Sequence, residues 1–125
     1  MANAPDRHEA VVLPDGVKKI QYIKEIQTPN TASFKIERED HTIGNLLRMQ
    51  LLRDRDVIFA GYRQPHPLQH HIIVRVQTKF TGNPQVDTDP AQALRQAMDD
   101  LNSEFTLLSE RLEFELQKQF IAPST

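Results

Sequence analysis

The chain has 125 residues, a formal net charge of −2 and no cysteine. A chain of this length corresponds to one domain, which we expect to span residues 1–125. The near-neutral charge argues against nucleic acid or an anionic membrane as the main partner, because both require a strongly basic surface. The absence of cysteine excludes a disulfide framework, a thiolate nucleophile and a cysteine-based zinc site. No apolar run approaches the length of a transmembrane helix.

The first third of the chain predicts an arm followed by two strands. Residues 1–18 are expected to form an irregular arm, because proline and glycine interrupt any periodicity. Its apolar segment 11–13 needs a surface on which to lie. Residues 20–26 alternate between apolar and polar side chains and predict a short strand. After a turn signal, residues 32–37 alternate in the same way and predict a half-buried strand.

A helix is predicted to begin at residues 39–42 and to end near residues 53–54. Asp40 is the candidate N-cap, because an aspartate there can accept a hydrogen bond from a free backbone N–H. Gly44 inside the helix costs about 1 kcal/mol relative to alanine. Two interpretations stay open for it: the close approach of a backbone or bulky side chain, or a tolerated weak point. The apolar face of this helix consists of Ile43, Leu46, Leu47 and Leu51.

Two further strands are predicted in the middle of the chain. Residues 57–63 are apolar on both sides, which predicts an interior strand. Pro65 and Pro67 end that strand, because proline cannot sit in a central strand. Residues 71–79 alternate cleanly, and one side of this strand carries Ile72, Val74 and Val76.

Residues 90–121 predict a long helix without an internal glycine or proline. Pro90 suits the first turn, with Thr88 or Asp89 as N-cap. The helix would extend about 48 Å, whereas a domain of this size is only about 35 Å across. It is therefore too long for its own domain, and a second subunit is the simplest cover for its far end. The alternative is a core helix that folds back or frays. Its apolar stripe follows spacings of 4-3-4-3-4-4-4 and comprises Leu94, Met98, Leu101, Phe105, Leu108, Leu112, Leu116 and Phe120.

The predicted element order is β-β-α-β-β-α, which defines an α+β fold. We expect a small antiparallel sheet with the two helices on one face. The long C-terminal helix, residues 90–121, is expected to form a dimerisation interface.

A histidine cluster offers an alternative function of a different class. His66, His70 and His71 lie close in sequence and, with nearby carboxylates, suggest a small metal-dependent or acid/base enzyme. However, neighbouring residues on a strand point to opposite faces, so at most one of His70 and His71 can join His66. The competing interpretation is a polar turn that leads into a strand. A nucleic-acid-binding module is a third possibility, but no basic stripe with interleaved aromatic residues supports it.

Three blocks of sequence resemble one known family. Residues 34–48, FKIEREDHTIGNLLR, resemble the alpha motif of the small alpha-like subunits of RNA polymerases, E-D-H-T-L-G-N-L-L/I-R, and depart from it only at Ile43. Residues 57–68 are similar to the family's V-L-F-A-G-Y-K…P-H-P-L stretch, and residues 75–78 match its R-V-Q-T strand end. Residues 3–9 also fit the family's N-terminal pattern.

The details of these blocks indicate a branch of the family. The residues of the second block favour the RNA polymerase II branch over the subunit shared by polymerases I and III. The extended N-terminal arm, residues 1–18, argues against the shorter archaeal members. The sequence differs from the family at His8, where an aromatic residue is usual, and in the loop 80–89, which is longer.

The resemblance implies a non-catalytic assembly subunit without an active site or cofactor of its own. It would heterodimerise with the larger alpha-like subunit and form the platform for the two largest polymerase subunits in messenger RNA synthesis in the nucleus. The equivalent subunit of another nuclear or archaeal polymerase is the alternative within the family. His41, Thr42, Asn45 and Arg48 would contact a large subunit or fix the helix start. The expected partner-binding residues are Ile43, Leu46, Leu47, Leu51, Leu94, Met98, Leu101, Phe105, Leu108, Leu112, Leu116 and Phe120.

Overall fold

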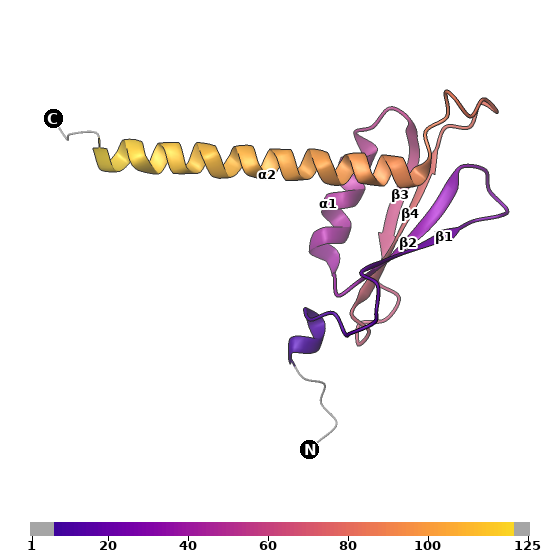
Figure 1. Cartoon of the computed structure of the whole chain (residues 1–125), viewed down its shortest axis with the longest axis horizontal. Coiled ribbons are helices and arrows are strands. Elements are labelled where there is room, and N and C mark those ends of the chain that lie inside the picture. Colours follow the sequence, from indigo (N-terminus) through magenta and orange to yellow (C-terminus); the bar gives the residue numbers. More distant parts are fainter. Residues whose placement is uncertain (1–6, 122–125) are drawn as a thin grey trace, which may run out of the picture.

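The structure is a computed structural model that describes residues 7–121. The described chain forms a four-stranded antiparallel sheet with the strand order β1-β2-β4-β3, as Figure 1 shows. The predicted order β-β-α-β-β-α is confirmed, with a short 3₁₀ helix before it. The elements are η1 (Arg7–Ala10), β1 (Ile20–Lys24), β2 (Thr31–Glu37), α1 (His41–Leu52), β3 (Val57–Arg63), β4 (His71–Thr78) and α2 (Pro90–Ile121).

One face of the sheet forms the core. Strands β2 and β4 run side by side at its centre, and Phe34 of β2 lies opposite Val74 of β4. These side chains pack against Leu47 and Leu51 of α1 and against Leu94 of α2. Both α-helices of the described chain therefore cover the same face of the sheet, as the sequence predicts (Figure 1).

Helix α1 begins and ends at the predicted residues. The Asp40 side chain accepts a hydrogen bond from the backbone N–H of Thr42 at 2.9 Å, which satisfies a donor that has no partner within the helix. Arg53 is the C-cap. The prediction that Asp40 is the N-cap is thus confirmed.

Helix α2 is continuous from Pro90 to Ile121 and is too long for the body on which it starts. The Asp89 carboxylate accepts a hydrogen bond from the backbone N–H of Ala91 at 3.3 Å, in agreement with its predicted capping role. The first part of the helix packs on the sheet, and the remainder extends past α1 into solvent (Figure 1). Every residue from 102 to 120 is exposed. The helix does not fold back, so that form of the alternative is wrong.

Three details of the fold differ from the prediction. The arm is not wholly irregular, because Arg7–Ala10 form η1, and the exposed Val11 that follows does not lie on the body. Strand β1 ends at Lys24, two residues early. Residues 3–6 of the N-terminal family pattern lie outside the described part of the chain.

The prediction that residues 57–63 form an interior strand is wrong, because β3 lies at the edge of the sheet. One of the two apolar sides of β3 faces the sheet surface that the helices leave uncovered, instead of the core. There the Phe59 ring lies under the Arg75 guanidinium, 5.6 Å from its central carbon. Gly61 leaves room for the ring, since a Cβ at that position would lie 3.2 Å from Phe59 Cζ.

Candidate dimerisation interface

The outer half of α2 carries more exposed large apolar side chains than any other element of the described chain. The stripe begins in the core at Leu94 and passes through the half-buried Met98 and Leu101. Beyond the body its residues become exposed, with Leu108 at 62% and Phe120 at 86%. Contiguous apolar surface of this kind marks a binding site more often than a solvated face. We call the exposed part of this stripe the front stripe; it consists of Phe105, Leu108, Leu112, Leu116 and Phe120.

The structure divides the twelve expected partner-binding residues into three groups. Leu47, Leu51 and Leu94 are at most 4% exposed and belong to the chain's own core, so they offer no surface to a partner. Their assignment as partner-binding residues is corrected for that reason. Ile43, Leu46, Met98 and Leu101 are half-buried. The remaining five are the front stripe.

Other exposed apolar residues lie outside the expected set. Met49 and Leu52 are half-exposed on α1, on the side that faces away from the core. Met49 was missed because it belongs to neither the apolar face nor the polar motif of that helix. Leu107 and Phe114 of α2 are also exposed and lie off the front stripe.

The polar residues of the alpha motif lie on the outward side of α1. His41, Thr42 and Asn45 are exposed, and Arg48 is half-buried. The Arg48 guanidinium donates to the Asn45 side-chain oxygen at 2.8 Å, one turn away. This polar side shares the outward surface of the helix with Met49, so it is accessible to another subunit.

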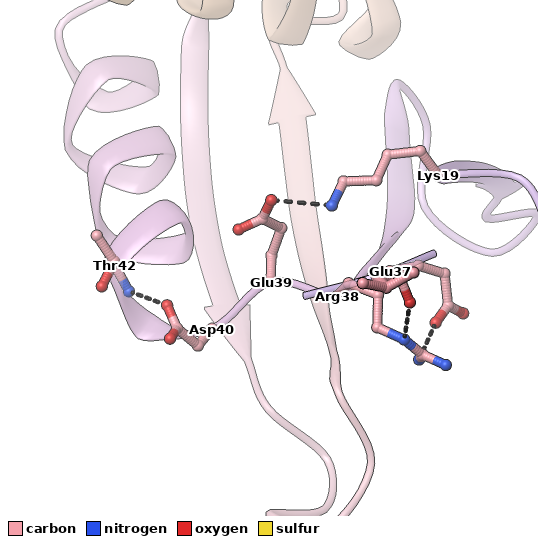
Figure 2. A network of polar contacts seen from close by, with 7 residues as sticks. Lys19, Glu37, Arg38, Glu39, Asp40 and Thr42 are labelled. Atoms are coloured by element: carbon pink, nitrogen blue, oxygen red, sulfur yellow. Dashed lines mark hydrogen bonds and ion pairs between the residues drawn. The ribbon is translucent and has the colours of Figure 1, made fainter. Parts of the chain in front are cut away.

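The charged residues before α1 hold the chain in place, as Figure 2 shows. Arg38 adopts a φ of 57°, which is rare for a residue with a side chain. Its Nε donates to the Val12 carbonyl at 3.3 Å and its Nη1 to Glu37 at 3.2 Å (Figure 2). Lys19 donates to the Glu39 carboxylate at 2.9 Å. These carboxylates therefore act as structural partners that hold the segment before α1.

The close approach of a bulky side chain explains Gly44. A Cβ at this position would lie 2.4 Å from Cδ2 of Tyr62, a distance that real side chains do not tolerate. The ring of Tyr62 is held in turn by His41, whose Nδ1 lies 3.0 Å from the Tyr62 hydroxyl. The first interpretation of Gly44 is thus confirmed, and His41 fixes the ring that requires the glycine.

The histidines of the cluster have different local roles. Nδ1 of His66 accepts a hydrogen bond from the backbone N–H of Leu68 at 3.1 Å, which is a turn interaction. His71 starts β4, and burial, with the nearby positive charge of Lys35, lowers its pKa. Among residues 7–121, no group of three His, Asp or Glu side chains is placed to hold a metal ion. The described geometry lends no support to the metal-dependent enzyme.

Five of the 15 lysine and arginine side chains form ion pairs within the described residues. Arg75, for example, binds Glu25 through two hydrogen bonds of 2.8 and 2.9 Å, and this interaction lowers the pKa of the glutamate. Further ion pairs join Lys19 to Glu39, Lys35 to Glu37, Arg38 to Glu37 and Arg53 to Glu104.

Within residues 7–121, none of the helices combines the length and the apolar character that crossing a membrane requires.

A small α+β body that projects the apolar half of a long helix defines a dimerisation module. The chain belongs to the RNA polymerase Rpb3/Rpb11 dimerisation domain family, whose model matches residues 31–111. The matched region contains β2, α1, β3, β4 and the first two thirds of α2. The resemblance drawn from the three sequence blocks is therefore confirmed.

Relatives of this chain bear the name of one polymerase subunit. The DNA-directed RNA polymerase II subunit rpb11 of Dictyostelium discoideum is 47% identical over 117 residues, which are 94% of this chain and 92% of the relative. A probable RPB11 subunit of Caenorhabditis elegans is 47% identical over 116 residues, 93% of this chain and 89% of the relative. The RPB11 subunit of Schizosaccharomyces pombe is 42% identical over 104 residues, 82% of this chain and 84% of the relative.

A solved archaeal structure shares the fold. Subunit L of the DNA-directed RNA polymerase of Thermoplasma acidophilum superposes with a TM-score of 0.67 at 20% identity, over 85% of this chain and 96% of that protein. The α+β class and the long C-terminal helix are therefore features of a known fold.

Proposed function

We propose that the chain is a non-catalytic assembly subunit of a nuclear DNA-directed RNA polymerase II and acts as a single dimerisation domain. Its direct partner is the larger alpha-like subunit. The observation that carries this proposal is the front stripe, in which apolar residues stay exposed over the whole outer half of α2. The family and the names of the relatives support the choice of polymerase.

The energetics of the front stripe indicate that α1 also contributes to pairing. Burying half-exposed leucine and phenylalanine side chains stabilises a complex by about 1–2 kcal/mol each, so the stripe supplies roughly 5–10 kcal/mol. Association itself costs about 4–15 kcal/mol in lost freedom of motion. The stripe alone therefore only balances this cost. The half-exposed Met49 and Leu52 of α1 provide additional apolar side chains on a second helix.

The platform role extends the proposal to the two largest polymerase subunits. His41, Thr42 and Asn45 are exposed polar residues of the family motif, and Arg48 is anchored to Asn45. Polar side chains that a fold leaves exposed on a helix are suited to a second, more polar contact. We assign this contact to a large subunit.

A single charge in the front stripe tests the pairing. Leu108→Asp places a carboxylate at the centre of the stripe, and an unpaired charge buried in an apolar interface costs several kcal/mol. We expect co-expression with the larger alpha-like subunit to give no co-purifying complex. Because Leu108 is exposed in the chain, the far-UV circular dichroism should not change.

Gln92→Asp is the matched control, because it adds the same charge to α2 at an exposed polar position on the part of the helix that lies on its own body. This variant should give a stable 1:1 complex, as should the unaltered chain, by solution mass measurement. An intact heterodimer with Leu108→Asp would contradict the proposal.

A further inference from the structure

The outer half of α2 has a second apolar face opposite the front stripe. Leu107 is 45% exposed and Phe114 is 61% exposed. At about 100° per residue, Phe114 lies about 180° around the helix from Phe105 of the front stripe. Leu107 and Phe114 are seven residues apart and share one side. We call these two residues the back face.

The same side of the helix is polar where α2 lies on its own body. Gln92, Gln96 and Ser103 precede Leu107 and Phe114 at spacings of 4, 7, 4 and 7, which keeps all five on one side. Gln92 and Gln96 are exposed to solvent where the helix lies on the body, and Ser103 is exposed just beyond it. The apolar residues of this side, Leu107 and Phe114, belong to the outer half of α2, which extends beyond the body in Figure 1. Water therefore covers the polar part of this side. The change from polar to apolar side chains indicates that something other than water covers the part beyond the body.

The side chains of the described chain do not provide that environment. The Lys118 ammonium lies 5.6 Å from the centre of the Phe114 ring and covers one part of it. The ring nevertheless remains mostly exposed. Glu110, Arg111 and Leu107 border a shallow hollow beside it. The hollow gives a partner side chain a place to enter against the ring.

We propose that the larger alpha-like subunit encloses the outer half of α2 on both the front stripe and the back face, in a groove. This inference rests on the proposed function. Apolar residues on opposite sides of a helix leave the water only when both sides are covered. A helix is about 10–12 Å wide, so one subunit can reach both sides. The change to apolar residues coincides with the point at which α2 leaves its own chain, which favours the dimer partner as the cover.

The test is a binding titration that contains only the two subunits. The double variant Leu107→Gln with Phe114→Gln removes the back face and keeps residues that favour a helix. We expect its Kd for the purified larger alpha-like subunit to rise by at least about 100-fold, from the loss of two buried apolar side chains. The matched control, Gln92→Ala with Gln96→Ala, alters the same side over the body and should change the Kd by less than about twofold.

The outcomes separate this inference from the proposed function. A Kd unchanged by the double variant, together with loss of binding by Leu108→Asp, would mean that only the front stripe is covered and would overturn the inference alone. Normal binding by both variants would overturn the proposed function as well. Side-chain oxidation gives an independent readout: Phe114 should be protected in the two-subunit complex, and a ring that stays reactive there would contradict the groove.

Discussion

Replacement of Gly44 by alanine tests whether packing outweighs helix propensity in α1. Propensity alone predicts that alanine stabilises the helix by about 1 kcal/mol. In the structure the new methyl would lie 2.4, 2.7 and 2.8 Å from three ring carbons of Tyr62. Tyr62 has little freedom to move, because its hydroxyl is bonded to His41 and its ring packs on the core. Overpacking of this kind costs about 1–3 kcal/mol.

The steric cost outweighs the gain in propensity, so we expect Gly44→Ala to lower the free energy of unfolding by up to about 2 kcal/mol. Urea denaturation of the purified chain, followed by far-UV circular dichroism, measures this change at constant protein concentration. A double-mutant cycle with Tyr62→Ala is the control, because the methyl is harmless once the ring is gone. An increase in stability in the Tyr62 background and a decrease in the native background are expected. Stabilisation by Gly44→Ala in the native background would refute the reasoning.

Two further predictions concern the start of α1 and the start of β4. Asp40→Ala removes the acceptor for the Thr42 N–H and should reduce the free energy of unfolding by about 1 kcal/mol. Asp40→Asn keeps an acceptor and should retain most of the stability. Equal urea midpoints for the two variants would contradict the capping role. Burial and the charge of Lys35 lower the pKa of His71 below 6.5, so the unfolded chain takes up the proton first. Stability that is complete above pH 6.5 should therefore decline as the pH falls towards the lowered pKa, and His71→Gln should flatten this part of the profile. An unchanged profile in that variant would show that other groups cause the slope.

The elements whose signals are local could be predicted from the sequence. Asp40 caps α1 through a residue two positions away, and Pro90 begins α2 where its missing N–H is harmless. The alternation of Ile72, Val74 and Val76 identified the buried side of β4. These patterns depend on neighbours in the chain, so tertiary contacts did not change them.

The candidate interface could be predicted only in part. Leu94 and Leu108 hold equivalent places in one stripe, yet Leu94 lies in the core and Leu108 in solvent. Helical periodicity reports which side of the helix is apolar, but it does not report where the body beneath the helix ends. Leu47 and Leu51 were misassigned for the same reason, since their side of α1 covers this chain's own sheet.

Strand order and long-range contacts were also beyond the sequence. Residues 57–63 carry apolar side chains in both directions, which does not distinguish a central strand from an edge strand with a side chain such as Phe59 on the open face. The ring that explains Gly44 belongs to Tyr62, which lies on another element. The family motif was recognisable, but its residues show their separate roles only when β3 and the arm are placed around α1.

The bare outer half of α2 has a consequence for how much of this subunit a cell can hold. A copy synthesised without its partner displays a row of leucine and phenylalanine side chains that a folded protein normally hides. Such surfaces promote aggregation and are recognised by chaperones and proteases, so surplus copies are removed. We therefore expect the abundance of the subunit to follow the supply of its partner, because pairing covers this surface.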